Sequence, residues 1–119
     1  MSTLTENKML VCVLSFSLAA FGALAGCGSD SGGLGTCPPD SSAQQAAGLK
    51  VIANSCTVCH NPNYAMGTPA GGLDFTSADE VKAEAAEMYA EAEEGAMPPT
   101  GKLSEADLEA LRVHLACTQ

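Results

Sequence analysis

Two cysteines and a histidine stand close together in the pentapeptide Cys56-Thr57-Val58-Cys59-His60. Cys-x-x-Cys-His is the pattern of c-type haem attachment, in which both thiols form thioether bonds with porphyrin vinyl groups and the imidazole ligates the iron. Cys-x-x-Cys also occurs at thioredoxin-like redox sites and at zinc sites. The full pentapeptide predicts one covalent haem c, held by Cys56, Cys59 and His60.

The rest of the chain favours haem over the two alternatives. A thioredoxin-like site needs a strand before the motif and an α/β fold after it, and the sequence signals neither. A zinc site needs a fourth ligand, for which only the distant Cys37, Cys117 and His114 are available. With three Phe, two Tyr and no Trp, the side chains alone would fill a small core poorly. A haem would supply the missing apolar volume.

The motif requires a helix that presents both cysteines. We expect one from Ser41 to Cys59, because the preceding prolines Pro38 and Pro39 prevent an earlier start and Ser41 or Ser42 can cap it. In this helix Cys56 and Cys59 lie at i and i+3 on one face. Residues 60–76 are rich in Gly, Asn and Pro and predict a loop that wraps the porphyrin edge.

A second helix is predicted from the capping box Ser77-Ala78-Asp79-Glu80 to Gly95, which stops it. Apolar side chains recur at helical spacing on one face, namely Val81, Ala85, Met88, Tyr89 and Ala92. The other face carries the acidic residues Glu84, Glu87, Glu91 and Glu94. We interpret this acidic face as solvated, and docking of a basic partner is the alternative.

A third helix begins at Ser104 with the capping box Ser104-Glu105-Ala106-Asp107, across which Leu103 and Leu108 form a hydrophobic staple. Its apolar stripe is Leu108, Leu111 and Leu115. No segment has a useful strand pattern. The fold class is therefore predicted to be all-α, with three main helices around one cofactor.

The N-terminal segment reads as a targeting signal. Residues 9–24 form an apolar run of secretory length, and Leu24-Ala25-Gly26-Cys27 matches the bacterial lipobox, in which Cys27 is acylated after cleavage. The alternative is a permanent transmembrane anchor or a buried helix. We predict a signal peptide at 1–26, a flexible Gly/Ser tether at 27–36 and the folded domain at 37–119. The domain would be extracytoplasmic and lipid-anchored to a bacterial membrane, with the outer membrane favoured.

The environments of the six cysteines predict one disulfide. Cys12 lies in the signal, Cys27 carries lipid, and Cys56 with Cys59 carries haem, which leaves Cys37 and Cys117. In an oxidising compartment such a pair is expected to form a bond, and two free thiols are the alternative. Closure of a loop of about eighty residues would stabilise the fold by roughly 4 kcal/mol.

From about Cys37 to Gln119 the chain resembles the small bacterial class I cytochromes c. The resemblance rests on the first helix, on Cys56-x-x-Cys59-His60, and on Gly95-Ala96-Met97-Pro98-Pro99 before a capped last helix. It implies that Met97 is the distal axial ligand of the iron.

The same resemblance assigns lesser roles to other residues. It implies close helix approach at Gly48 with Ile52 packing beside it, a packing role for His114, and a Pro carbonyl, for which Pro69 is the candidate, that holds the His60 ring. Met66, Met88 and His114 are the competing axial ligands. Met66 follows His60 too closely to reach the opposite haem face easily, and Met88 falls on the apolar stripe.

These assignments predict an electron carrier and not an enzyme. With His60 and Met97 on the iron, no small-molecule substrate would find an open site. The net charge of −9 argues against nucleic acid, so the expected partners are redox donor and acceptor proteins, possibly basic ones, and the membrane through the lipid. A haem-based sensor and a subunit of a larger respiratory enzyme are the alternatives.

Overall fold

The computed structural model describes residues 32–119. Their elements are α1 (Ser42–Val51), η1 (Ile52–Cys56), η2 (Ala65–Gly67), η3 (Ala70–Gly72), α2 (Ala78–Ala83), α3 (Ala85–Glu94) and α4 (Glu105–Cys117). No strand occurs in this part of the chain, which confirms the all-α prediction. The predicted signal peptide and the predicted lipid site at Cys27 lie outside the described residues.

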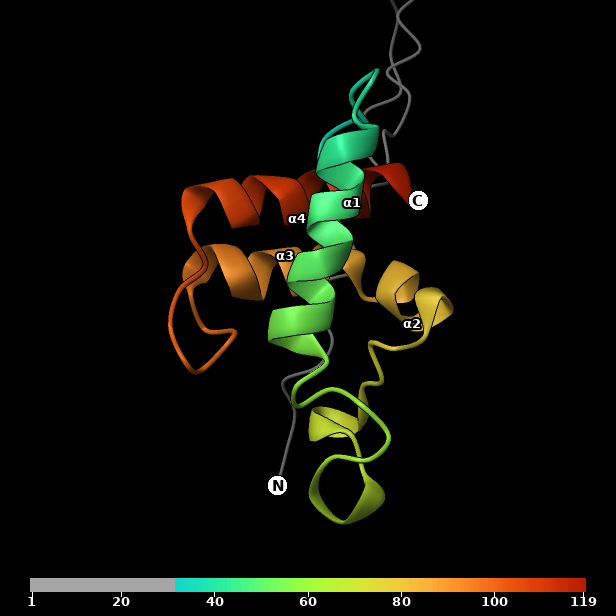
Figure 1. Ribbon diagram of the computed structural model, residues 1–119, viewed down its shortest axis with the longest axis vertical. Coiled ribbons are helices and arrows are strands. Elements are labelled where there is room, and N and C mark those ends of the chain that lie inside the picture. The colour runs from blue at the N-terminus through green and yellow to red at the C-terminus, as the bar shows by residue number, and fades with distance from the viewer. Residues whose placement is uncertain (1–31) are drawn as a thin grey trace, which may run out of the picture.

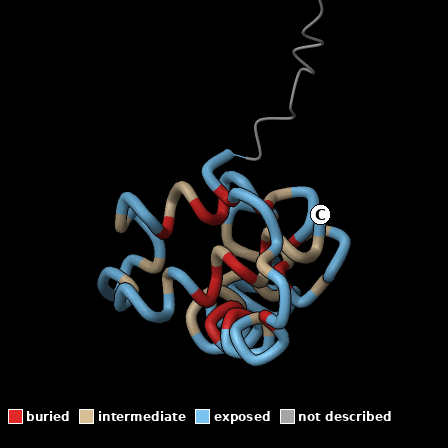
Figure 2. The backbone as a smooth tube through the Cα atoms, turned by 90° about the horizontal axis from the view of Figure 1, so that it is seen from above, coloured by how far each residue is buried: buried red, intermediate tan, exposed pale blue. Residues whose placement is uncertain are grey.

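The helices pack as a crossing arrangement. In Figure 1, α3 and α4 run side by side and α1 crosses them at a steep angle, with its main packing surface on α4. Figure 2 shows the buried residues gathered where the helices meet. The hydrophobic core combines residues of α1, η1, α2, α3 and α4 with one residue before α1 and one before α2. Its members are Leu34, Val51, Ile52, Phe75, Val81, Ala85, Met88, Tyr89, Ala92, Leu111 and Leu115.

The first helix departs from the prediction at both ends. Ser41 stands at the N-cap position, but its hydroxyl donates to the Pro38 carbonyl at 2.8 Å and does not cap the helix. Regular α-helix ends at Val51, and a single π-helical turn, η1, carries the chain to Cys56. Cys59 therefore lies beyond the helix instead of on its last turn.

The predicted second helix is divided in two. Ser77 caps α2 as predicted, with its hydroxyl accepting from the Glu80 amide at 3.4 Å, and Gly95 ends α3 in the left-handed conformation with φ 82°. At Glu84 the backbone leaves helical geometry (φ −99°, ψ 9°), which separates α2 from α3. The apolar stripe predicted across the whole segment is nevertheless buried on one side, as expected.

The last helix follows its prediction closely. The Ser104 hydroxyl accepts from the Asp107 amide at 3.1 Å, so the predicted cap is present. Leu111 and Leu115 are fully buried, whereas Leu108 is only half-buried. α4 thus contributes the largest fully buried side chains of the domain other than Leu34.

Gly48 lies where α1 and α4 make their closest approach. A Cβ built on Gly48 would overlap the Ala110 carbonyl oxygen and lie 2.5 Å from the Cβ of His114. The His114 Nδ1 lies 3.0 Å from the carbonyl oxygen of Gln45, which ties the same crossing together by a hydrogen bond. The close-approach role of Gly48 and the packing role of His114 are therefore confirmed.

A Gly48→Ala exchange is expected to destabilise the domain by about 1–3 kcal/mol, the usual effect of overpacking. The sign is informative, because at an exposed helix position the same exchange stabilises by up to about 1 kcal/mol. The free energy of unfolding in urea measures it, with Gln44→Ala on the exposed side of α1 as the control. A stabilised Gly48→Ala domain would show that α1 and α4 do not meet at this point.

One residue of the predicted tether, Leu34, is packed in the hydrophobic core. Leu34 is 1% exposed, and its carbonyl accepts a hydrogen bond from Arg112 of α4. The prediction of a flexible tether through residue 36 is therefore wrong for Leu34, whose burial in the core was not signalled by its Gly-rich surroundings. The folded part begins before residue 37.

Cys37 and Cys117 connect the two ends of the domain. Their sulfur atoms lie at bonding distance and their Cα atoms are 4.6 Å apart, within the usual range for a disulfide. The buried Ser41 lies beside this pair, with its Oγ 3.6 Å from the Cys117 sulfur. The geometry supports the proposed disulfide between the segment that precedes α1 and the last residue of α4.

Candidate functional site

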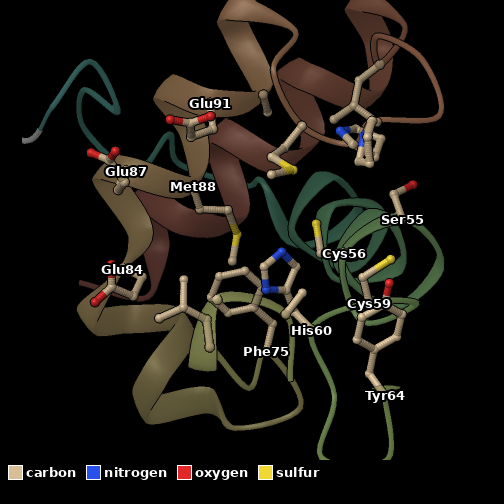
Figure 3. A pocket seen from close by; sticks show the side chains of 18 residues that line it. Ser55, Cys56, Cys59, His60, Tyr64, Phe75, Glu84, Glu87, Met88 and Glu91 are labelled. Atoms are coloured by element: carbon tan, nitrogen blue, oxygen red, sulfur yellow. The ribbon is translucent and has the colours of Figure 1, made fainter. Parts of the chain in front are cut away.

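A cavity of about 450 Å³ lies between the end of η1, the loop of residues 61–75, α3 and the loop that precedes α4. Most of its lining is apolar, and the pentapeptide contributes Cys56, Cys59 and His60 (Figure 3). The loop between α3 and α4 contributes Met97. Four residues that the sequence predicted for one site are thus brought to one cavity from segments nearly forty positions apart.

A tight turn presents the pentapeptide to the cavity. The Cys56 carbonyl accepts from the amides of Cys59 at 3.3 Å and His60 at 3.0 Å. The following loop folds back on this turn, because the Ala70 amide donates to the Cys59 carbonyl and the Phe75 amide donates to the His60 carbonyl, each at 3.0 Å. These bonds hold the motif against the loop that forms the cavity floor.

The two thiols of the motif are free. Figure 3 shows both on the same side of the cavity as the His60 ring. Burial raises the pKa of the Cys56 thiol to about 11, so this group stays protonated at neutral pH. Two thiols on the same side of the cavity as an imidazole fit the attachment of a flat apolar group through both sulfurs.

The His60 ring is positioned by packing. Its centroid lies 4.7 Å from that of Phe75 at an interplanar angle of 35°. The Nδ1 atom is buried and has no hydrogen-bond partner within residues 32–119. The hydrogen bond predicted from the His60 ring to the Pro69 carbonyl is therefore not formed in this structure, where that carbonyl accepts from the Gly72 amide at 2.9 Å.

Met97 reaches the cavity through the end of α3. The left-handed Gly95 turns the chain, after which the amides of Ala96 and Met97 both donate to the Glu91 carbonyl, at 2.9 and 3.1 Å. These bonds fix the backbone of Met97 against the helix end. Its side chain lines the cavity and is 43% exposed.

The three competing axial ligands lie in different environments. Met66 is fully exposed and does not line the cavity, and His114 is held at the α1–α4 crossing by its bond to Gln45. Met88 is 7% exposed, belongs to the core and also contributes to the cavity wall. Among these candidates only Met88 remains as a rival to Met97.

The acidic face of the second predicted helix is only partly a solvated surface. Glu84, Glu87 and Glu91 line the cavity, on the side away from the two thiols in Figure 3, and Glu84 and Glu91 are half-buried. Glu94 is exposed as predicted. Helical periodicity placed these residues on one face, but it did not indicate that the face borders a cavity.

The residues fit a haem better than a metal ion bound directly by the protein. Within residues 32–119 no three His, Cys, Asp or Glu side chains are grouped so as to hold a metal ion. The cavity falls in the size range of cofactor sites and has the apolar lining they require. Cys56 and Cys59 would hold the porphyrin, and His60 would ligate its iron.

Several cavity residues were not singled out as site residues from the sequence. They are apolar or aromatic side chains of the two loops that flank the helices, and the main ones are Tyr64, Leu73, Phe75, Pro98, Pro99 and Leu103. The only available signal was their apolar type within otherwise polar loops. These side chains come together only in the folded chain, where the two loops border the same cavity.

The family comparison matches most of the described chain. A family model described as "Cytochrome C oxidase, cbb3-type, subunit III" matches residues 43–115, more than half of the full sequence. The matched range contains the pentapeptide, Met97 and all of the main helices except the two ends. No curated protein and no solved structure shows a significant match to the chain.

Proposed function

We propose that this chain, which belongs to the family described as cytochrome c oxidase, cbb3-type, subunit III, carries single electrons on one covalently attached haem. A cytochrome c domain of this family is an electron-transfer haem protein, and it exchanges electrons with redox partner proteins. The finer proposal is a monohaem carrier with His60 and Met97 as axial ligands. It is a carrier of electrons and does not itself convert a substrate.

The observation that carries this proposal is the convergence on one apolar cavity. Cys56 and Cys59 place their thiols beside His60, while Met97 enters from the loop after α3. When bound, the haem iron supplies a one-electron couple between its ferrous and ferric states. The apolar side chains exclude water, and the neutral thioether of Met97 disfavours the extra positive charge of the oxidised state.

The proposed location is the outer side of a bacterial membrane. The apolar run of residues 9–24 and the lipobox that ends at Cys27 support a lipid anchor, and the paired Cys37 and Cys117 suit an oxidising compartment. A helix of the length and apolar character needed to cross a membrane is not found in residues 32–119. The excess of acidic residues supports basic redox partners.

Membership of an oxidase-subunit family favours a second candidate, a cytochrome subunit of a larger oxidase. In that case the chain would pass electrons within a stable complex instead of diffusing between partners. Purification from membranes in mild detergent separates the two possibilities. Co-elution with an oxidase through successive columns would identify a subunit, and elution of the haem-loaded chain alone would identify a carrier.

A spectroelectrochemical titration, combined with a carbon monoxide binding assay, separates the proposed electron carrier from a haem-based sensor. We expect a one-electron transition of the purified protein and no rapid binding of carbon monoxide by the reduced form, because Met97 fills the position at which it would bind. Met97 is 43% exposed, and its side chain is the one that carbon monoxide would have to displace from the iron. Rapid and stoichiometric carbon monoxide binding would contradict the carrier and favour the sensor.

A further inference from the structure

The chain enters the pentapeptide through an unusual helical turn. In an α-helix the Thr57 amide would donate to the Ala53 carbonyl, but in the π-helical turn η1 it donates to the Ile52 carbonyl at 3.0 Å. The Thr57 hydroxyl donates to the released Ala53 carbonyl at 2.6 Å. One residue therefore satisfies two consecutive carbonyls. Single π-turns within helices are frequent at functional sites.

The Asn61 side chain makes hydrogen bonds to the C-terminal part of the same turn. Its side-chain amide donates to the carbonyls of Thr57 at 2.6 Å and Val58 at 3.3 Å, which belong to the two residues between the cysteines. Its Oδ1 accepts from the Asn63 amide at 2.9 Å, so the side chain is held from both ends. No continuing helix supplies amides to these two carbonyls, because the chain turns into the loop.

We infer that Thr57 and Asn61 are positioning residues that fix the turn carrying Cys56, Cys59 and His60. The inference rests on the proposed haem attachment and adds two residues to it. Thr57 directly follows Cys56, and Asn61 directly follows His60, so the two side chains lie next to residues that would hold the haem. Their hydrogen bonds join the helix end to the start of the loop, so they limit how far either thiol can move relative to the imidazole.

A positioning role differs from simple helix termination in what it affects. A residue that only ends the helix would change the free energy of unfolding and leave the haem properties as they are. A residue that positions the motif would change how many thioether bonds form, because each thiol must be held within reach of its own vinyl group, and it would also alter the reduction potential. These two properties are therefore the readouts.

Thr57→Val and Thr57→Ser form a matched pair for the first residue. Valine keeps the shape of threonine without the hydroxyl, and serine keeps the hydroxyl. The bond from the Thr57 hydroxyl to the Ala53 carbonyl is exposed, so water can replace it, and its net loss shifts an equilibrium by at most roughly fivefold. We expect Thr57→Val to raise the fraction of chains joined to haem by one thioether by at most that factor, and Thr57→Ser to match the parent. The thioether count is read by mass spectrometry and from the α-band of the pyridine haemochrome.

Asn61→Asp tests the second residue. The ionised aspartate is isosteric and still accepts from Asn63, but it cannot donate to the two carbonyls and places negative charge against them. We expect more single-thioether product and a shifted reduction potential. Asn63→Asp is the control, because it adds the same charge two residues away on an exposed side chain for which no side-chain hydrogen bond is found. It should keep the parent's thioether count.

The outcomes separate this inference from the proposed function. A parent chain that carries no covalent haem would overturn the proposed function. A haem-loaded parent whose thioether count and potential are reproduced by both Thr57→Val and Asn61→Asp would overturn the inference alone. Changes in these properties that Thr57→Ser and Asn63→Asp do not share would support it.

Discussion

Replacement of Met97 by alanine is expected to abolish the sulfur-to-iron absorption band and to lower the reduction potential on the order of 100 mV, a part of the roughly 0.8 V range over which axial ligands act. The reason is electrostatic and chemical. A thioether stabilises the ferrous state relative to the ferric state, and its loss removes that preference. The measurement is a redox titration followed by absorption, with parent and variant side by side.

Two further methionine variants serve as controls. Met66→Ala should leave band and potential unchanged, because Met66 lies on the surface outside the cavity. Met88→Leu keeps the volume of the buried side chain without its sulfur, and it should keep the band as well. Retention of the band in Met97→Ala together with its loss in Met88→Leu would transfer the axial role to Met88.

The carboxylates on the cavity wall act in the opposite direction to Met97. Glu84, Glu87 and Glu91 add negative charge near the cofactor position, and negative charge favours the more positive oxidised state. The potential would then reflect a balance between the thioether of Met97 and the acidic wall. As the proposed ligand, Met97 would act on the iron directly, so its removal is expected to have the larger effect.

Replacement of both Cys37 and Cys117 by serine is expected to lower the free energy of unfolding by about 4 kcal/mol. The two residues are 80 positions apart, so the bond would close almost the entire folded chain and restrict its unfolded state strongly. Urea unfolding of parent and double variant, both without reductant, measures the difference. The haem spectrum should stay that of the parent, because neither residue lines the cavity.

A reductant control identifies the source of this effect. Reduced parent protein should unfold at the same urea concentration as the double variant, and reductant should not change the variant. Two titratable free thiols at Cys37 and Cys117 in protein purified without reductant would contradict the disulfide. An equal stability of parent and double variant would show that the bond does not constrain the unfolded chain.

Local signals predicted the caps of α2 and α4 correctly. Ser77 and Ser104 cap their helices because a capping box depends on residues three positions apart. The pentapeptide is local in the same sense, so its residues were predicted together. Met97 came from a resemblance and not from spacing, and the structure then placed it at the same cavity.

Features that depend on packing could not be predicted in this way. The break at Glu84 has no Gly or Pro to announce it, and the π-turn before Cys56 has no known sequence signal in this chain. Leu34 lies in a Gly-rich segment, but it is buried in the core, and its carbonyl accepts from Arg112 of α4, far along the chain. The roles of Thr57 and Asn61 depend on which backbone carbonyls the turn leaves without an amide partner, and only the folded structure shows these.

We propose that Cys56 and Cys59 bind one haem covalently. The most direct test of this proposal is the mass and absorption spectrum of the denatured chain after expression with the haem-attachment machinery, compared with the Cys56→Ser/Cys59→Ser double variant. We expect the parent to gain the mass of one haem and to show c-type bands when reduced, and the double variant to show neither change. A parent chain that remains colourless, or releases its haem on denaturation, would contradict it.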